Sequence, residues 1–581
     1  MSQSISIYYD GDCPFCKKYT KLVRLREAVA DVRLVDLRRD SEHRQRFVAE
    51  GIDLDKGMVV EFDGRTYHGD KAMWLLATLS GKSNFFNRFN FFLFSNAWLS
   101  ALLYPLLRLC RNTVLLVLGR QSLAVDNEGI ARHFALFCFG WGVFSCLAFI
   151  IYAAKYNAEL YPSTWLMLVL GFLLVLFPGN KRIFLALVAV QIVDGVLQMP
   201  IYSNHTILKN FFLLAVLAGG IIHALAGNSW QRFFVSIQPV GRALLAIMYV
   251  FGVWHKINSG FLDPEASCAR ALWEKMPLFF SVFDHQAVYF AGIYGTLVIE
   301  TVILACLLIP RVRWIGIVAG ILFHSMLAMS QYAFYSSFSM LTVALHLLFV
   351  SPASAVVITQ SRQWRKLVET PLLLRALAYG LWFGFIGWLA WHGLYTAAAA
   401  IWLLGMLMFF VAVSNHARDA DDRGVGEMLV SPTRVVNIVT LLFFFNCITP
   451  YLGLKTAQSM NMFANLRLEG GESNHLILRN APGPFEYLDD IAEITSAYGN
   501  LHLAYIQHSG LRIVYYQLLD ILEKNPDVKV SFIRKGVMHE NQTGETLRDD
   551  IDQILHPRWF RKWFHFTPVE IQAPKPCSPT S

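Results

Sequence analysis

Long apolar runs fill the chain from about residue 134 to residue 452. A helix needs about 20 mostly apolar residues to cross a bilayer, or fewer where it is buried among other helices. The pattern therefore predicts about eleven membrane helices, near 134–153, 164–178, 183–201, 211–226, 240–257, 287–309, 314–330, 336–352, 373–392, 395–414 and 435–452. The second, fourth, seventh and eighth of these runs are short for a span.

A different pattern precedes these runs, between residue 4 and about residue 80. Short apolar stretches, such as SISIYY, VRLVDL and GMVVEFDG, alternate with helix-like segments such as PFCKKYTKLVRLREAV and KAMWLLATLS. The order predicted is β-turn-α-β-α-β-β-α, which is a small α/β domain. The Phe- and Leu-rich stretch 84–119 is interrupted by polar residues and is predicted to be an interfacial helix rather than a span.

The chain becomes much more polar after residue 452. A turn-rich RNAPGPFEY, a strand-like DVKVSFIRKG and a Pro-rich end are typical of a soluble α+β domain. The sequence thus predicts a multidomain membrane protein with an α/β domain at 1–125, an all-α membrane domain at 130–452 and a C-terminal domain at 453–581.

Composition agrees with a membrane location. The 581 residues are 55% hydrophobic and only 16% charged, with a mean hydropathy of +0.42, which excludes an ordinary soluble enzyme. The net charge of +8 comes from Lys and Arg scattered through short loops, so no nucleic-acid partner is expected. The N-terminus lacks a secretory signal, and most loop Lys and Arg lie inside if it is cytoplasmic. An odd number of spans then makes the C-terminal domain extracytoplasmic.

Only one close cysteine pair occurs among the nine cysteines, Cys13 and Cys16 in DCPFC. A CxxC at the start of a helix just after a strand favours the thiolate of the first cysteine, and the second can then attack a mixed disulfide. The alternatives are half of a zinc site or two unreactive thiols. Zinc would need a second ligand pair, and His43 and His68 are far apart in the sequence, so no metal is predicted.

The segments YYDGDCPFC and VVEFDGRTYHGDKAMWLL give a specific resemblance. Residues 1–125 resemble the DCC family of thiol-disulfide oxidoreductases, named for an Asp-Cys-x-x-Cys motif. The resemblance implies a thioredoxin-like fold and a redox role for Cys13 and Cys16. It makes Asp10 and Asp12 supporting residues.

Several ionisable residues lie in or near the predicted spans, where an unpaired charge is costly and a functional role is a default hypothesis. For each one alone, a structural hydrogen bond or an interfacial position is an equally good interpretation. The candidates are Asp194, His223, His255, Lys256, Glu300, His324 and His346.

A second resemblance covers roughly 130–480. The stretches YVFGVWHKINSGFLDPEASCARALW, ETVILACLLIPRVRWIGIVAGILFHSM and PYLGLKTAQSMNMFANLRLEGGESNHLIL are similar to the membrane domain of vitamin K-dependent gamma-carboxylases and their bacterial, HTTM-like relatives. The resemblance implies a quinone cofactor, a bacterial inner-membrane location and a site facing the outer compartment. It implies that Lys256 is the base that deprotonates the reduced quinone. His255 stands where the family has a second lysine, and His324 matches an FH motif, with Glu300 as its structural partner.

The residues around Lys256 support the same interpretation. A lysine desolvated among Trp254, Tyr249 and Phe261 is suited to proton abstraction, whereas the alternative is a lysine that extends to the membrane boundary. Cys268 and Cys447 both fall near the outer boundary and are candidates for a disulfide.

Three functions follow from these features. The leading hypothesis is a membrane oxidoreductase whose thiol pair exchanges electrons with a quinone-like lipid in the membrane domain. In the second, the thiol domain is the only catalyst and acts on cytoplasmic protein thiols, with the membrane domain as its anchor. In the third, the chain is a transporter or lipid-binding protein regulated by its redox domain.

Overall fold

The computed structural model describes most of residues 3–79, a few positions between 80 and 126, most of 127–571, and residue 577. The described residues form two compact units, one of Met1–Asn127 with Gly220–Phe233 and one of Glu128–Gly219 with Phe234–Ser581. The predicted interfacial helix at 84–119 lies outside the described residues apart from isolated positions. The longer gaps are 20–28, 95–126, 157–161, 226–229, 278–284, 417–424 and 572–576.

The N-terminal domain has a four-stranded mixed sheet in the order β2-β1-β3-β4. Strand β1 pairs in parallel with β2 and antiparallel with β3, and β3 and β4 form a hairpin. This topology confirms the predicted α/β domain, while most of the helix predicted at 14–29 lies outside the described residues. The elements are β1 (Gln3–Tyr9), β2 (Val29–Asp36), α2 (Ser41–Ala49), β3 (Val59–Phe62), β4 (Arg65–His68) and α3 (Asp70–Leu79).

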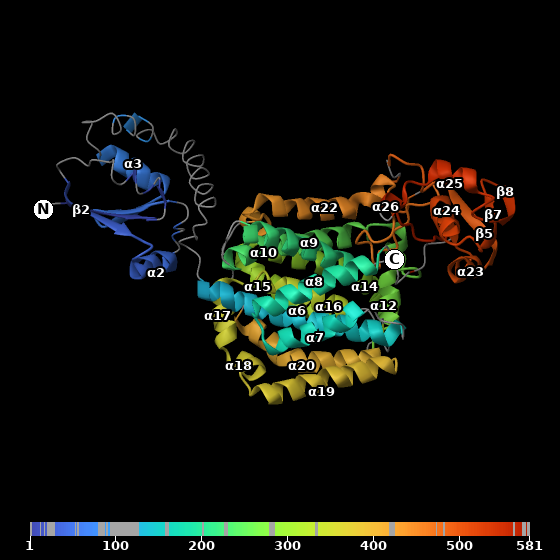
Figure 1. The fold of residues 1–581 in the computed structure, drawn as a ribbon, viewed down its shortest axis with the longest axis horizontal. Helices are drawn as coiled ribbons and strands as arrows, with labels where there is room; N and C mark the ends of the chain where they lie inside the picture. Colours follow the sequence, from blue (N-terminus) through green and yellow to red (C-terminus); the bar gives the residue numbers. More distant parts are fainter. Residues whose placement is uncertain are drawn as a thin grey trace. The chain divides into compact units, whose positions relative to one another are not determined.

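Side chains alternate between the two faces of this sheet along each strand, and both faces carry buried residues. Ile5 and Ile7 of β1 belong to a cluster with helix α3, whereas Tyr8 packs with Phe47 of α2. Figure 1 shows α2 and α3 on opposite sides of the sheet. Cys13 and Cys16 belong to the cluster on the α3 side.

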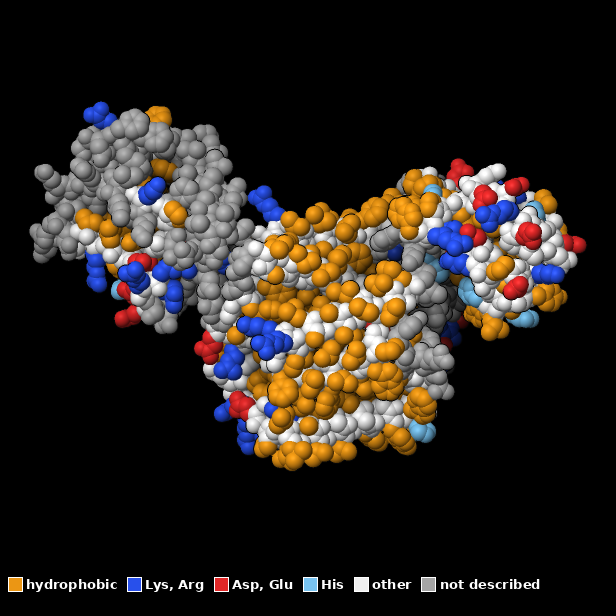
Figure 2. Space-filling model, in the orientation of Figure 1, with side chains coloured by type: hydrophobic (Ala, Val, Ile, Leu, Met, Phe, Trp, Pro, Cys, Tyr) orange, Lys and Arg blue, Asp and Glu red, His pale blue; other side chains and the backbone are white. Residues whose placement is uncertain are grey.

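Among the described residues, eight helical segments between residues 128 and 452 are long and apolar enough to cross a membrane. Several run roughly parallel to one another (Figure 1), and their exposed side chains form a continuous hydrophobic face (Figure 2). These features indicate an integral membrane protein. Six of the segments are single helices, α6 (Asn127–Tyr156), α9 (Asn204–Leu225), α10 (Trp230–Trp254), α14 (Gln286–Leu308), α19 (Leu372–Trp391) and α20 (Tyr395–His416). The other two, Pro310–Ala328 and Arg434–Leu452, reach spanning length because 3-10 turns extend α15 (Arg313–Ala328) and α22 (Asn437–Ile448).

The structure thus has eight segments of spanning length among the described residues, or nine with one bent pair, where the sequence predicts eleven. In the bent pair, α16 (Tyr335–Leu347) and α17 (Pro352–Gln360) meet at 115°. The predicted span 336–352 breaks there because Ser351 caps a new helix that begins with Pro352.

The other two predicted spans form shorter helices, α7 (Pro162–Leu176) and α8 (Lys181–Leu197). At 1.5 Å per residue they are about 22 Å and about 26 Å long, less than the ~30 Å hydrocarbon core. Asp194 of α8 accepts hydrogen bonds from Ser163 and Thr164 of α7 at 3.1 and 2.8 Å. The two helices therefore satisfy each other's polar groups inside the helical region.

The C-terminal residues form the predicted α+β domain. Its antiparallel sheet has the order β6-β5-β7-β8, and helix α24 supplies Leu518, Leu519 and Leu522 to the core. The elements are β5 (Ile491–Tyr498), α23 (Leu501–His508), β6 (Arg512–Val514), α24 (Tyr515–Lys524), β7 (Lys529–Arg534), β8 (Val537–Gln542), α25 (Arg548–Ile554) and α26 (Arg558–Arg561).

Candidate functional site

The cysteine pair lies directly after strand β1. The backbone N–H of Cys13 donates to the carbonyl oxygen of Asp10 at 3.1 Å, which closes a tight turn. Pro14 and Cys16 are already helical, and the N–H of Cys16 donates to Sγ of Cys13 at 3.3 Å. This N–H is one of the donors that a helix leaves unpaired at its N-terminus, so Sγ of Cys13 accepts a hydrogen bond there.

Two aspartates hold this turn in place. Asp10 is buried and receives two hydrogen bonds from Arg38, at 2.8 and 3.1 Å. Asp36 at the end of β2 accepts from the N–H of Gly11 at 3.0 Å, and a Cβ at Gly11 would lie 2.0 Å from an Asp36 carboxylate oxygen. Asp10 therefore positions the backbone before Cys13. Asp12, the other predicted supporting residue, lies outside the described residues.

The thiols are deeply placed, because Cys13 is 0% and Cys16 8% exposed. An external molecule therefore reaches Sγ of Cys13 only when the residues that cover it move. The described part of the chain contains no group of three or more His, Cys, Asp or Glu side chains suited to a metal ion.

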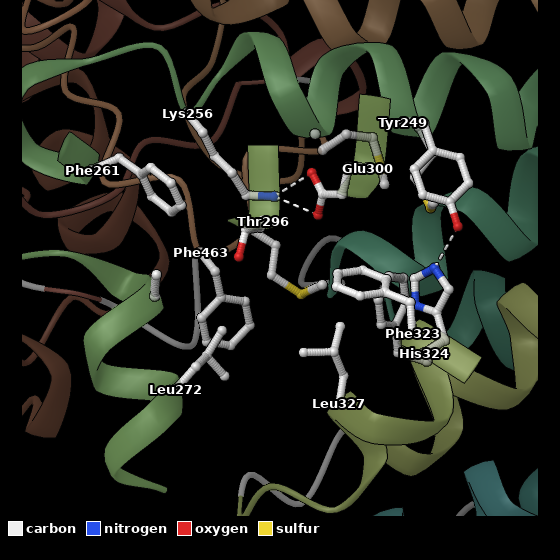
Figure 3. Close-up of a pocket in the computed structure, with 16 residues that line it drawn as sticks. Tyr249, Lys256, Phe261, Leu272, Thr296, Glu300, Phe323, His324, Leu327 and Phe463 are labelled. Carbon is white, nitrogen blue, oxygen red and sulfur yellow. Dashed lines mark hydrogen bonds and ion pairs between the residues drawn. The ribbon is translucent and has the colours of Figure 1, made fainter. Parts of the chain in front are cut away.

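The helical region contains a second candidate site, a cavity of about 80 Å³ (Figure 3). Its walls are mostly apolar and come from α10, α12 (Cys268–Glu274), α14, α15, α16 and the segment after α22. Figure 3 shows Lys256 and Glu300 together at one part of the wall, and Tyr249 with His324 at another. The lining residues are Met248, Tyr249, Gly252, Lys256, Phe261, Ala269, Leu272, Thr296, Glu300, Phe323, His324, Leu327, Phe338, Met460, Met462 and Phe463.

Lys256 and Glu300 form a buried ion pair at this cavity. Nζ of Lys256 lies 2.7 Å from both carboxylate oxygens of Glu300, and the two side chains are 8% and 12% exposed. Glu300, expected as a partner of His324, thus pairs with Lys256 instead, because the turn after α10 places Lys256 beside α14. Of the aromatic residues expected around Lys256, Tyr249 and Phe261 line the cavity. Trp254 packs against His475.

The two histidines that the second family resemblance implicates, His255 and His324, occupy different environments. His255 is fully buried but is not among the lining residues. Its Nδ1 lies 2.7 Å from the Tyr451 hydroxyl and its Nε2 lies 3.1 Å from the Ser459 carbonyl oxygen, so it joins α10 to the segment after α22. His324 lines the cavity and lies 2.9 Å from the Tyr249 hydroxyl oxygen.

The sequence analysis missed the role of the segment that follows the last span. Met460, Met462 and Phe463 line the cavity although they lie outside any helix. Four residues of this segment have a left-handed backbone conformation, with φ between 53° and 62°: Gln458, Met460, Phe463 and Asn465. Such conformations are costly for non-glycine residues and concentrate at ligand sites. The available signal was the polar, Met-rich stretch TAQSMNMFAN directly after a span.

The predicted pairing of Cys268 with Cys447 is wrong. Cys268 forms a disulfide with Cys577, while Cys447 is a free, buried thiol inside α22. The N–H of Cys268 also donates to Oδ1 of Asn465 at 2.8 Å. Helix α12, which supplies Ala269 and Leu272 to the cavity, is therefore attached both to the segment after α22 and to the last residues of the chain.

Comparison with known protein families gives one finding. Residues 7–116 match the family model of DCC1-like thiol-disulfide oxidoreductases. The match includes both cysteines, the strands of the N-terminal sheet from within β1 onward, and helices α2 and α3. No curated protein and no solved structure matches the chain. Residues 7–116 are thus a domain of a thiol-disulfide oxidoreductase family, joined to a helical region with many helices of membrane length.

Proposed function

We propose that this chain is a membrane-bound thiol-disulfide oxidoreductase in which Cys13 is the nucleophile and Cys16 the resolving thiol. The observation that carries the proposal is the N–H of Cys16 directed at Sγ of Cys13 at the start of a helix, within a domain that matches this family. Local N–H donors and the positive end of a helix stabilise the attacking thiolate.

The two electrons that reduce the partner's disulfide come from the thiols of Cys13 and Cys16. The Cys13 thiolate attacks one sulfur of a partner's disulfide, and the other partner sulfur leaves as a thiolate that takes up a proton. The Cys16 thiolate, having lost its own proton, then attacks Sγ of Cys13, releasing the second partner thiol and leaving a Cys13–Cys16 disulfide. The partner is a protein disulfide in the compartment of the N-terminal domain, for which the loop charges favour the cytoplasm.

A second candidate function adds a quinone-like lipid as the electron partner of the thiol pair. The cavity with its buried ion pair in the helical region favours such a partner. Two thiols and one quinone would give one disulfide and one quinol. The cavity volume of about 80 Å³ leaves room for part of a ring. Common small-molecule pockets are much larger, at about 300–1,000 Å³. The thiol exchange is therefore the better-supported function, and coupling to a quinone is its extension.

Trapping tests the thiol exchange. Cys16→Ser is expected to accumulate mixed disulfides through Cys13, visible as high-mass bands on a non-reducing gel of isolated membranes. Cys13→Ser is expected to give none, and Cys306→Ser, a change at another free thiol, is expected to leave exchange unchanged. Equal adducts in the Cys13→Ser and Cys16→Ser proteins would contradict the assigned roles.

Alkylation with a mass tag tests the quinone extension. If a quinone is the electron partner, adding it to membranes protects Cys13 and Cys16 from alkylation in the wild type but not in Lys256→Ala. Protection that is equal in both proteins, or absent from both, would remove the cavity from the electron path and leave the thiol exchange intact.

A further inference from the structure

A short helix carries exposed cations at one end of the helical region. Helix α18 (Arg362–Val368) follows α17 directly, because Ser361 ends one helix and its hydroxyl oxygen accepts the N–H of Trp364 in the next, at 3.2 Å. Helices α16 and α17 meet at 115°, so the chain leaves the direction of the span before α18 begins. We therefore expect α18 at the membrane surface rather than within a span.

One side of α18 is anchored in the helical region. Trp364 is 3% exposed, and its ring centroid lies 5.5 Å from that of Phe139 in α6. The hydroxyl group of Tyr379 in α19 donates to the carbonyl oxygen of Leu367 at 2.9 Å. These contacts hold the backbone in place, and the exposed side chains of α18 are three cations, Arg362, Arg365 and Lys366.

The three cations lie on one face of α18. Residues three and four apart in a helix are neighbours, and like charges at these spacings destabilise the helix. Arg365 and Lys366 follow Arg362 at these spacings. Glu369 is the one acidic residue in the sequence 351–375, and none of the three cations pairs with it among the residues that the structure describes. An anion bound to this face would remove the repulsion.

The turn between α7 and α8 brings a fourth cation to the same end. Arg375 of α19 donates to the carbonyl oxygens of Thr370 and Leu176, at 2.8 Å each, which joins the segment after α18 to the last residue of α7. Arg182 lies in the first turn of α8, and its side chain is exposed. Within the described part of the chain, Arg182 forms no ion pair.

Helix α6 shows that the turn and α18 are neighbours. A Cβ at Gly179 in the turn would lie 3.2 Å from the Cβ of Ala135, and Phe139, which contacts Trp364, lies one helical turn after Ala135. One turn is about 5.4 Å long. The turn and α18 thus contact adjacent positions of α6, and Figure 2 shows Lys and Arg side chains at this end of the hydrophobic face, where Figure 1 places α17 and α18.

Other arginines at helix ends have structural partners. Arg242 and Arg313 are both 0% exposed and donate to the carbonyl oxygens of Leu348 and Leu307, at 2.6 and 2.9 Å. Their charges stabilise the carbonyl ends of α16 and α14. The side chains of Arg182 and of the three α18 cations have no such partners among the described residues, so they are available to a ligand.

We propose that Arg182, Arg362, Arg365 and Lys366 bind the phosphate group of an anionic phospholipid in the adjacent leaflet. Guanidinium groups donate paired, charge-assisted hydrogen bonds to phosphate oxygens. The loop charges favour the cytoplasmic side for this end of the helices, and anionic lipids attract basic segments at that surface. The site uses neither the cysteine pair nor the cavity, so it goes beyond the proposed thiol exchange.

The surroundings of the four cations favour a lipid with a net negative charge. Leu373 and Leu374 at the start of α19 are 71% and 56% exposed, and Phe177 after α7 is 40% exposed. These side chains offer an apolar surface to acyl chains beside the cations. A zwitterionic lipid brings a cation of its own, which the four positive charges repel. Free phosphate has no acyl chains and gains nothing from the apolar surface.

Binding of phosphatidylglycerol to the full-length protein, measured by native mass spectrometry from detergent, tests the proposal. Phosphatidylcholine at the same concentration is the comparison, because it carries the same phosphate group without a net charge. The wild type is expected to bind phosphatidylglycerol at least about tenfold more tightly, since each cation near an anionic headgroup adds to the attraction. Equal affinities for the two lipids would overturn the proposal.

Matched double variants separate this site from a general attraction of basic loops for anionic lipids. The double variant Arg362→Gln, Arg365→Gln is expected to weaken binding of phosphatidylglycerol by about tenfold or more. The control is Arg311→Gln, Arg434→Gln, which removes the same charge from two other exposed positions between helices and should change binding less than about threefold. Equal losses in both proteins would show that net charge, and not this cluster, attracts the lipid.

Hydrogen exchange gives a second measurement that needs only the wild type. Peptides covering 361–370 should exchange more slowly in nanodiscs of phosphatidylglycerol than in nanodiscs of phosphatidylcholine, because a bound phosphate removes the repulsion within α18. Inorganic phosphate added to the phosphatidylcholine nanodiscs should not give this protection. Equal exchange in the two nanodiscs, or equal protection by inorganic phosphate, would overturn the lipid as the ligand.

Discussion

Nζ of Lys256 lies at equal distances, 2.7 Å, from the two carboxylate oxygens of Glu300. The residues come from sequence positions 44 apart and meet beside an apolar cavity. A pair held in this way is a fixed dipole in the wall, and each charge depends on the other for its stability in a region with little water.

Removing one member of this pair is expected to destabilise the helical region strongly. Lys256→Met leaves Glu300 as a buried carboxylate without its cation, at a cost of about 3–5 kcal/mol in unfolding free energy. The double variant Lys256→Met, Glu300→Leu removes both charges and should recover most of this loss. Thermal unfolding in one detergent compares the proteins. A double variant less stable than both single ones would contradict the interpretation.

Gly320→Ala is expected to disturb the contact between the Tyr249 hydroxyl oxygen and Nε2 of His346, which lie 3.2 Å apart. The new methyl group overlaps the His346 ring, and overpacking of this kind costs about 1–3 kcal/mol. The matched control is Gly292→Ala in α14, where a Cβ meets nothing within 4 Å. That change should be neutral or slightly stabilising, because alanine favours the helix. Equal melting temperatures for the two variants would show that α15 moves to make room.

The stability of the protein is expected to rise with pH above about 8 because of Lys455, which lies just beyond the last span. Burial lowers the pKa of Lys455 from its usual 10.5 to about 8, and its Nζ donates to the neutral Oδ1 of Asn446 at 2.6 Å. Between pH 8 and 10.5 the unfolded chain binds a proton that the folded chain has lost, so the free energy of unfolding increases, by roughly 3 kcal/mol in total. Below pH 8 Lys455 is charged in both the folded and the unfolded protein, so the full cost of burying its charge remains.

The comparison that isolates this effect is the difference between wild type and Lys455→Met across that pH window. The variant should be the more stable protein at pH 7, and its advantage should shrink as pH rises to 10.5. A difference that stays constant with pH would mean that Lys455 does not titrate in this range.

Cys577→Ser is expected to destabilise α12 and the wall that it contributes to the cavity. The change opens the disulfide to Cys268, and loss of a native disulfide costs about 2–5 kcal/mol. Hydrogen exchange in peptides covering 259–276 should increase, while α19 should be unaffected. Cys306→Ser serves as the control, because that thiol is free. Unchanged exchange at 259–276 would show that the contact of Asn465 with Cys268 is sufficient by itself.

Arg38→Met is expected to loosen the turn that carries Cys13. Asp10 is buried and loses two hydrogen bonds, so the N-terminal domain should lose on the order of 3 kcal/mol. Cys13 should then react faster with iodoacetamide. Arg39→Met is the control, because the Arg39 side chain is 89% exposed and its contact with Asp36 is long, at 3.9 Å. Equal alkylation rates in the two variants would argue against a positioning role for Asp10.

The features predicted correctly from the sequence depend on residues close together in the chain. Cys13, Cys16 and the strand before them form a local pattern, and the helices of spanning length follow from apolar runs. The ion pair of Lys256 with Glu300 depends on where the turn after α10 lies relative to α14, for which a hydropathy pattern gives no information. The partner of Cys268 lies 309 residues away, and the cavity-lining segment around Met460 has no periodicity. Helix α8 ends at Leu197, so a run that appeared long enough to cross a bilayer forms a helix shorter than the hydrocarbon core.

The Cys268–Cys577 disulfide also sets an order for the assembly of the protein. Because 309 residues separate the two cysteines, Cys268 emerges from the ribosome long before its partner exists and stays a thiol while the later helices and the C-terminal domain are made. The bond can therefore form only after almost all of the described chain has been made, and it then joins α12 to residue 577. A nascent chain that stops before residue 577 would leave Cys268 as an unpaired thiol in the helix that lines the cavity.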